Sequence, residues 1–186
     1  MTLPDLPAWM DYAPHLLEKA RAIRLLAMDV DGVLTCGEII YASDGQELKV
    51  FNVKDGLGLR LLRESGIQTA IITGRRSVIT ERRGEELGVD YIHQGVKDKH
   101  SLLEAILSEH QWTWPQVAYM GDDLPDLSVL KSVGLACCPS DAAPEVQSVC
   151  HLISRYPGGR GAIRELTDLL LYSQMRQLSA DSAISC

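Results

Sequence analysis

Short apolar segments alternate along the chain with segments whose apolar residues recur at helical spacing. The apolar segments predict buried strands at Ile23–Met28, Gln68–Thr73, Val89–His93, Gln116–Met120, Gly134–Cys138 and His151–Ser154. The helical spacing predicts amphipathic helices at Leu57–Glu64, Ser77–Leu87, Lys99–His110, Leu124–Ser132 and Ala162–Leu171. Gly66, Gly88 and Gly134 stand where glycines often end helices. This alternation predicts an α/β fold, a doubly wound, Rossmann-like parallel sheet covered by helices on both faces.

One segment departs from this alternation. Residues 38–53 read EIIYASDGQELKVFNV, two β-rich arms around Ser-Asp-Gly-Gln, and Asp-Gly between such arms favours a β-hairpin. We therefore expect a single domain at residues 23–176 that contains this hairpin. Residues 1–22 are expected to form an N-terminal helical extension. The small, polar residues 177–186 are expected to be a disordered tail.

Charge and cysteine content exclude several classes of function. The formal net charge of −7 argues against a general nucleic-acid binder. Five cysteines without a CxxC spacing argue against both a disulfide framework and a zinc site. No apolar segment approaches the roughly 20 residues of a membrane span, and the N-terminus does not resemble a signal peptide. We expect a cytoplasmic protein that does not bind membranes.

Two aspartates, Asp29 and Asp31, follow the first predicted strand within AMDVDGVLTC. A calcium loop is disfavoured because position 33 is Val and the loop does not follow a helix. A metal-binding Asp-x-Asp of a glycosyltransferase remains open. A third interpretation is phosphoryl transfer, in which one carboxylate attacks phosphorus, the second handles the proton of the leaving oxygen, and a metal reduces the charge repulsion.

Polar residues also follow the later strands, and strand ends meet at one edge of a parallel sheet. Thr73 and Gly74 can donate to a phosphoryl oxygen, although a strand-terminal Thr often only caps a helix. Lys99 begins a helix, against the preference of the helix dipole. The segment GDDLPDL places three acids near Asp29 and Asp31, which suggests a Mg²⁺ site. These acids are Asp122, Asp123 and Asp126, and the roles of the last two stay open.

In order and spacing, DVDGVLT, ITGR, the later Lys and GDDLPD resemble the four motifs of the haloacid dehalogenase superfamily of phosphohydrolases. The resemblance implies that Asp29 is the nucleophile and Asp31 the general acid and base. Thr73 and Lys99 would hold the phosphoryl group. Asp29, the backbone carbonyl of Asp31, and Asp122 would bind Mg²⁺. The intervals between these motifs are too short for the cap domain that most members carry, so we expect a capless enzyme.

The segments DVDGVLTCGEIIY, FNVKDGLGLRLL and GGRGAIRE resemble the family of 3-deoxy-D-manno-octulosonate 8-phosphate phosphatases, which implies a role in lipopolysaccharide precursor synthesis. Lys54 and Leu57 depart from the family's usual Arg and aromatic residue. Arg83 is equally compatible with a solvated helix position. The resemblance implies substrate contacts by Asp31, Asn52, Val53, Lys54, Asp55, Gly56, Arg60, Thr73, Gly74, Arg75, Arg83, Lys99 and Arg160.

The resembled family forms homotetramers in which four hairpins meet. It implies that the site is closed in trans, by the hairpin of one subunit and the segment around Gly158–Arg164 of another. Three alternatives remain: a phosphatase for a nine-carbon keto-acid sugar phosphate, a non-catalytic tetramerisation module, and a phosphomutase. The module is disfavoured because every motif residue is present, and the mutase because it usually needs a cap to exclude water.

Overall fold

The computed structural model describes residues 12–184, with side chains described as far as Gln174. Its centre is a six-stranded sheet in the order β5-β4-β1-β6-β7-β8, and all neighbouring strands are parallel. The predicted α/β fold is confirmed. The strands are β1 (Leu25–Met28), β4 (Gln68–Thr73), β5 (Tyr91–Gln94), β6 (Val117–Met120), β7 (Leu135–Cys138) and β8 (Leu152–Ile153).

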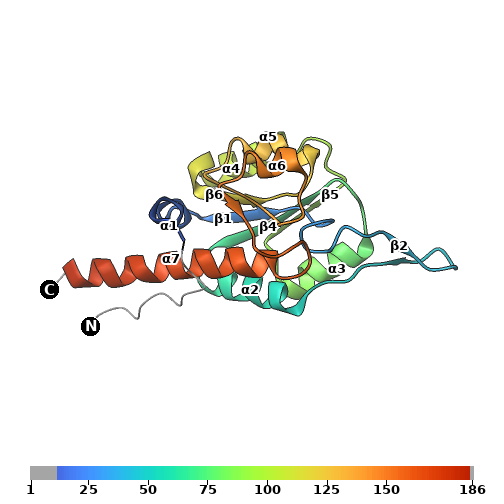
Figure 1. The fold of residues 1–186 in the computed structure, drawn as a ribbon, viewed down its shortest axis with the longest axis horizontal. Helices are drawn as coiled ribbons and strands as arrows, with labels where there is room; N and C mark the ends of the chain where they lie inside the picture. Colours follow the sequence, from blue (N-terminus) through green and yellow to red (C-terminus); the bar gives the residue numbers. More distant parts are fainter. Residues whose placement is uncertain (1–11, 185–186) are drawn as a thin grey trace.

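Helices cover both faces of this sheet (Figure 1). One layer is formed by α1 (Pro14–Arg21), α2 (Val53–Glu64), α3 (Val78–Leu87) and α7 (Ala162–Ile184). The other is formed by α4 (Lys99–His110), α5 (Leu127–Leu130) and α6 (Pro144–Gln147), and the short 3₁₀ helices are η2 (Trp114–Gln116) and η3 (Leu124–Asp126). None of the described helices is both long and apolar enough to cross a membrane.

The central strand β1 is buried on both faces, as its continuous apolar sequence predicts. Leu26 and Met28 pack into the core beneath α1, α2 and α7. Leu25 and Ala27 face the opposite core, beneath α4 and α5. Alternate residues thereby tie both helix layers to one strand, and its carboxyl end is held rigidly where Asp29 follows.

The predicted hairpin is present, but its paired part is short. β2 (Ile40–Tyr41) pairs antiparallel with β3 (Glu47–Leu48). The turn is closed by Ala42 N–H donating to the Gln46 carbonyl at 2.8 Å. The hairpin projects from the body of the molecule (Figure 1), and no cap domain is inserted within residues 12–184.

Several features differ from the sequence prediction. α2 begins at Val53 rather than Leu57, because the Asn52 side chain caps it by accepting from Lys54 N–H at 2.8 Å. α7 continues to Ile184 where a disordered tail was predicted, since extending an existing helix costs far less than starting one. Gly134 ends no helix; instead a Cβ there would collide with the Pro115 backbone. Of the predicted N-terminal extension, residues 1–11 lie outside the described part, and α1 accounts for most of the rest.

Candidate active site

A cavity of about 310 Å³ opens at the carboxyl ends of β1 and β4. The chain runs from β1 to β4 and β5 on one side and returns to β6, β7 and β8 on the other. This is the switch point at which open α/β sheets bind ligands. The cavity is lined by Asp29, Asp31, Thr73, Gly74, Arg75, Val96, Lys97, Lys99 and Pro125.

Lys99 links two carboxylates at the base of this cavity. Its Nζ lies 2.6 Å from Oδ2 of Asp29 and 2.7 Å from Oδ1 of Asp126. Burial opposes the charged ammonium, yet Asp29 and Asp126 raise the pKa of Lys99 above its ordinary value. Burial also raises the pKa of Asp29, against the opposing effect of Lys99. The start of α4 therefore supplies a fixed cation beside Asp29.

Asp126, whose role the sequence left open, is fully buried and accepts four hydrogen bonds. Oδ1 accepts from Lys99 and from the Tyr119 hydroxyl at 2.7 Å. Oδ2 accepts from the backbone N–H groups of Asp122 and Asp123. Because a carboxylate has about four acceptor sites, none is left for a cation. Asp126 therefore orients Lys99 and the loop after β6.

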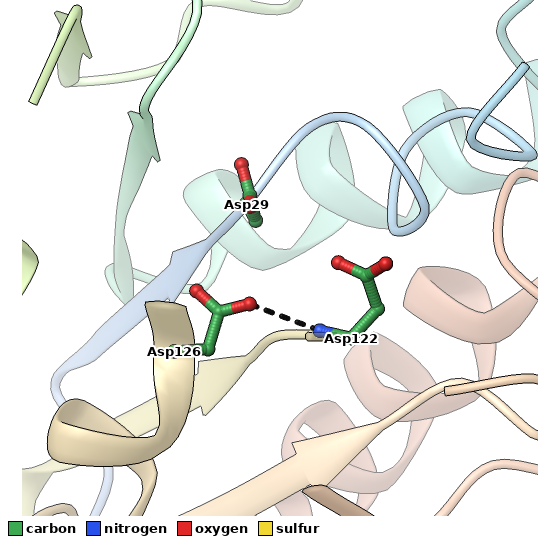
Figure 2. A group of neighbouring side chains, drawn as sticks. All are labelled: Asp29, Asp122 and Asp126. Carbon is green, nitrogen blue, oxygen red and sulfur yellow. Dashed lines mark hydrogen bonds between the residues drawn. The ribbon is translucent and has the colours of Figure 1, made fainter. Parts of the chain in front are cut away.

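Asp29, Asp122 and Asp126 converge from the ends of β1 and β6 and from η3, with oxygens within 4.8 Å of one another (Figure 2). Within the described residues, no donor contacts the Asp122 carboxylate. Burial and the charges of Asp29 and Asp126 raise the pKa of Asp122 to about 7. Carboxylate oxygens close together, with no cationic side chain of the described residues paired to Asp122, are suitable ligands for a hard divalent cation. Asp29 and Asp122 would hold it.

Asp31 contacts the hairpin of its own chain, which the sequence analysis missed. Lys49 Nζ forms an ion pair with Asp31 Oδ1, and the Lys49 side chain is 3% exposed. Arg75 Nε lies 3.5 Å from Asp31 Oδ2, and Arg75 Nη2 lies 2.8 Å from Oε1 of Glu47. No local sequence pattern signals this contact, because Lys49 lies 18 positions from Asp31. The rim of the cavity thus includes residues from the base of the hairpin.

Four residues predicted to bind substrate lie elsewhere. Asp55 is buried and accepts from the backbone N–H groups of Gly161 and Arg164, which caps the start of α7. Gly56 leaves room for the Arg83 side chain, which lies over the Phe51 ring. Arg60 lines a different cavity, between α2 and α3. None of these four residues lines the cavity at Asp29.

The remaining predicted residues line two further grooves. Asn52, Val53 and Arg160 share one with Cys36, and Lys54 shares another with Arg160 and Arg164. The segment at Gly158 and Gly159 packs against its own chain. Gly159 N–H donates to the Val33 carbonyl at 2.9 Å, and a Cβ at Gly158 would collide with the Gly32 carbonyl. The glycines of the segment predicted to close the site of another subunit therefore pack beside the Asp29 loop of their own chain.

Comparisons with known proteins agree with this geometry. Residues 89–163 match the model of the haloacid dehalogenase-like hydrolase family. The 3-deoxy-D-manno-octulosonate 8-phosphate phosphatase of Yersinia pestis is 45% identical over 162 residues, 87% of each chain. That of Escherichia coli K12 is 43% identical over 159 residues, 86% of this chain and 85% of its own.

Solved structures show the same fold. The Yersinia pestis phosphatase superposes with a TM-score of 0.86 at 45% identity, over 88% of both chains. The Moraxella catarrhalis phosphatase, solved with magnesium, phosphate and KDO, gives 0.86 at 40% identity, over 93% of this chain and 99% of its own. The fold and the cavity thus define a capless phosphomonoester hydrolase of the haloacid dehalogenase type. Within that class, the chain belongs to the 3-deoxy-D-manno-octulosonate 8-phosphate phosphatase family.

Proposed function

We propose that the protein is a Mg²⁺-dependent phosphatase that hydrolyses 3-deoxy-D-manno-octulosonate 8-phosphate through an aspartyl-phosphate intermediate. The observation that carries this proposal is the Asp29 carboxylate, held by Lys99 in an open cavity and close to Asp122, whose carboxylate accepts from no donor among the described residues. The named relatives support the substrate, and the Moraxella catarrhalis complex supports the metal. Lipopolysaccharide precursor synthesis in the cytoplasm is the corresponding role.

Asp29 is the proposed nucleophile. Its Oδ1 accepts from Val30 N–H at 2.6 Å and its Oδ2 from Lys99, which fixes the carboxylate while leaving lone pairs free to attack phosphorus. Asp31 gives a proton to the leaving sugar oxygen and later takes one from the water that hydrolyses the aspartyl-phosphate. Thr73, the backbone of Gly74, and Lys99 bind the phosphoryl oxygens.

Mg²⁺, when bound, would reduce the repulsion between the anionic substrate and the carboxylates. Asp29, the backbone carbonyl of Asp31, and Asp122 are the proposed ligands. Asp126 is excluded as a ligand because its four acceptor sites are already used. Arg75, on the rim, is the proposed contact for the substrate carboxylate.

A homotetramer is part of the proposal. Asn52, Val53, Lys54 and Arg160 line grooves separate from the cavity at Asp29, so substrate contacts by these residues require a neighbouring subunit. Exposed apolar side chains on the hairpin offer a surface for such contacts: Ile39, Ile40, Tyr41, Leu48 and Val50. Light scattering should give the mass of a tetramer, and Ile40→Asp should lower it.

The decisive experiment measures phosphate release from a panel of keto-acid sugar phosphates, with and without Mg²⁺. The eight-carbon substrate should have the highest kcat/KM, and EDTA should abolish turnover. Ca²⁺ should not restore it, because longer and more numerous oxygen contacts would disturb the position of Asp29. Preference for a nine-carbon substrate would replace the substrate assignment, and no turnover of any member would refute the enzymatic role.

A further inference from the structure

At the base of the hairpin, a carboxylate on β3 accepts a hydrogen bond from Arg75. Arg75 Nη2 donates to Oε1 of Glu47, on β3, at 2.8 Å. Tyr41, on β2, together with Asp31 and Glu47, raises the pKa of Arg75 above its ordinary value. Asp31 approaches Nε from the cavity side at 3.5 Å. The hairpin and the nucleophile loop together restrict the orientation of this guanidinium.

Glu47 is itself held by Ser77, outside the hairpin, and by Lys49 of the same hairpin. The Ser77 hydroxyl donates to Oε2 at 2.7 Å, and Lys49 Nζ lies 3.7 Å from Oε1. The Glu47 side chain is only 17% exposed. A carboxylate fixed at both oxygens can hold a guanidinium in one orientation, which a single exposed ion pair does not do.

Arg75 keeps donors for a ligand in this arrangement. A guanidinium has five N–H groups in a planar fork; Nη2 donates to Glu47 and Nε faces Asp31, so other N–H groups stay free of these two carboxylates. The group lines the cavity and its side chain remains 39% exposed. The remaining donors are therefore available to an anion in the cavity.

We propose that Glu47 is a positioning residue: by holding Arg75 on the rim of the cavity, it sets selectivity for a sugar phosphate that carries a second anionic group. This inference rests on the proposed function, because the second anion is the carboxylate of the keto-acid substrate. The hairpin thereby acts on the site of its own chain, independently of any contact between subunits.

The test is a double-mutant cycle. Glu47→Ala should raise KM for 3-deoxy-D-manno-octulosonate 8-phosphate about tenfold, with a much smaller change in kcat. The loss with p-nitrophenyl phosphate, which lacks the carboxylate, should be far smaller. In an Arg75→Ala background, Glu47→Ala should have no further effect on KM. Glu47→Gln, which keeps one acceptor oxygen, should lose less.

Asp44→Ala is the matched control, since Asp44 is an exposed acid of the same hairpin whose side chain, among the described residues, accepts only from Gln46 N–H. It should change KM less than twofold. An unchanged or lowered KM in Glu47→Ala would overturn the inference, as would equal losses with both substrates or an undiminished effect in the Arg75→Ala background. A crystal structure of Glu47→Ala should show the guanidinium displaced. If the wild-type enzyme does not turn over this sugar phosphate, the proposed substrate is wrong. If the guanidinium keeps its position in Glu47→Ala, the inference about Glu47 is wrong.

Discussion

The Asp122 carboxylate fills the space that a side chain at Gly32 would need. A Cβ at position 32 would lie well under 3.0 Å from Oδ2 of Asp122. Gly32 also has a φ of +89°, which L side chains rarely adopt. The residue after the Asp-x-Asp pair is therefore constrained by a proposed metal ligand that lies 90 positions later in the chain.

Gly32→Ala should displace Asp122 and weaken Mg²⁺ activation, lowering kcat by about 100-fold if one metal ligand is lost. The measurement is phosphate release across a Mg²⁺ titration. Gly45→Ala is the matched control, because Gly45 has a φ of +84° but no atom within 4 Å of an added Cβ. A similar loss of kcat in both variants would show that backbone strain, rather than displacement of Asp122, lowers the activity.

Asp29→Asn should abolish turnover, by a factor on the order of a thousand or more, because an amide cannot form the aspartyl-phosphate. Phosphate release and mass spectrometry of the trapped phosphoprotein measure this. The exposed Asp123, which caps η3 by accepting from Leu124 N–H, supplies the control Asp123→Asn with activity retained. Hydrolysis by Asp29→Asn at the wild-type rate would remove Asp29 as the nucleophile.

Asp126→Asn should destabilise the fold by about 3 kcal/mol, because Lys99 would keep a buried charge with only Asp29 as its partner. Tyr119→Phe removes one hydrogen bond to the same carboxylate and should cost about 1 kcal/mol. Urea unfolding measures both. A larger loss for Tyr119→Phe than for Asp126→Asn would contradict the central role of Asp126.

Glu165 should make stability depend on pH. Burial alone would raise its pKa, but hydrogen bonds from Ser154 and Arg155 lower it below the ordinary value of 4.5. A lowered folded-state pKa gives stability that is present above about pH 4.5 and is lost as the pH falls through the folded-state value.

Glu165→Gln should therefore reduce stability by about 2 kcal/mol at pH 7 and flatten its decline in acid. Urea midpoints between pH 3 and pH 7 would measure both effects. Glu145→Gln, at an exposed position in α6, is the control and should keep the wild-type slope. An unchanged slope in Glu165→Gln would show that other carboxylates cause the acid sensitivity.

The sequence predicted a doubly wound parallel sheet but not the order of its strands. It located the carboxyl ends of the strands well. Gln68–Thr73 is a strand with the predicted bounds, and the apolar segments place Asp29, Thr73 and Asp122 at one edge of the sheet. Periodicity succeeds here because burial on both faces leaves continuous apolar strands, whose ends stand out against polar residues.

Sequence reasoning could not find Lys49, Glu47 or Tyr119 as part of the site. Lys49 reaches Asp31 across 18 positions only because the hairpin folds back at its base, and no local pattern encodes that approach. Tyr119 sits in an apolar strand, where its hydroxyl is invisible to a pattern of hydrophobicity. Asp55 was predicted to contact substrate only because its segment resembles the family, whereas in the structure its carboxylate accepts from the backbone N–H groups of Gly161 and Arg164.

The contact between Gly158 and the loop at Gly32 also concerns synthesis of the chain on the ribosome. The proposed nucleophile leaves the ribosome early, but the backbone that packs against its loop is translated more than 120 residues later. A nascent chain that ends before Gly158 carries Asp29 and Asp31 without the segment that supports their loop. Activity should therefore arise late in translation, and a ribosome stalled before this segment should display an inactive chain.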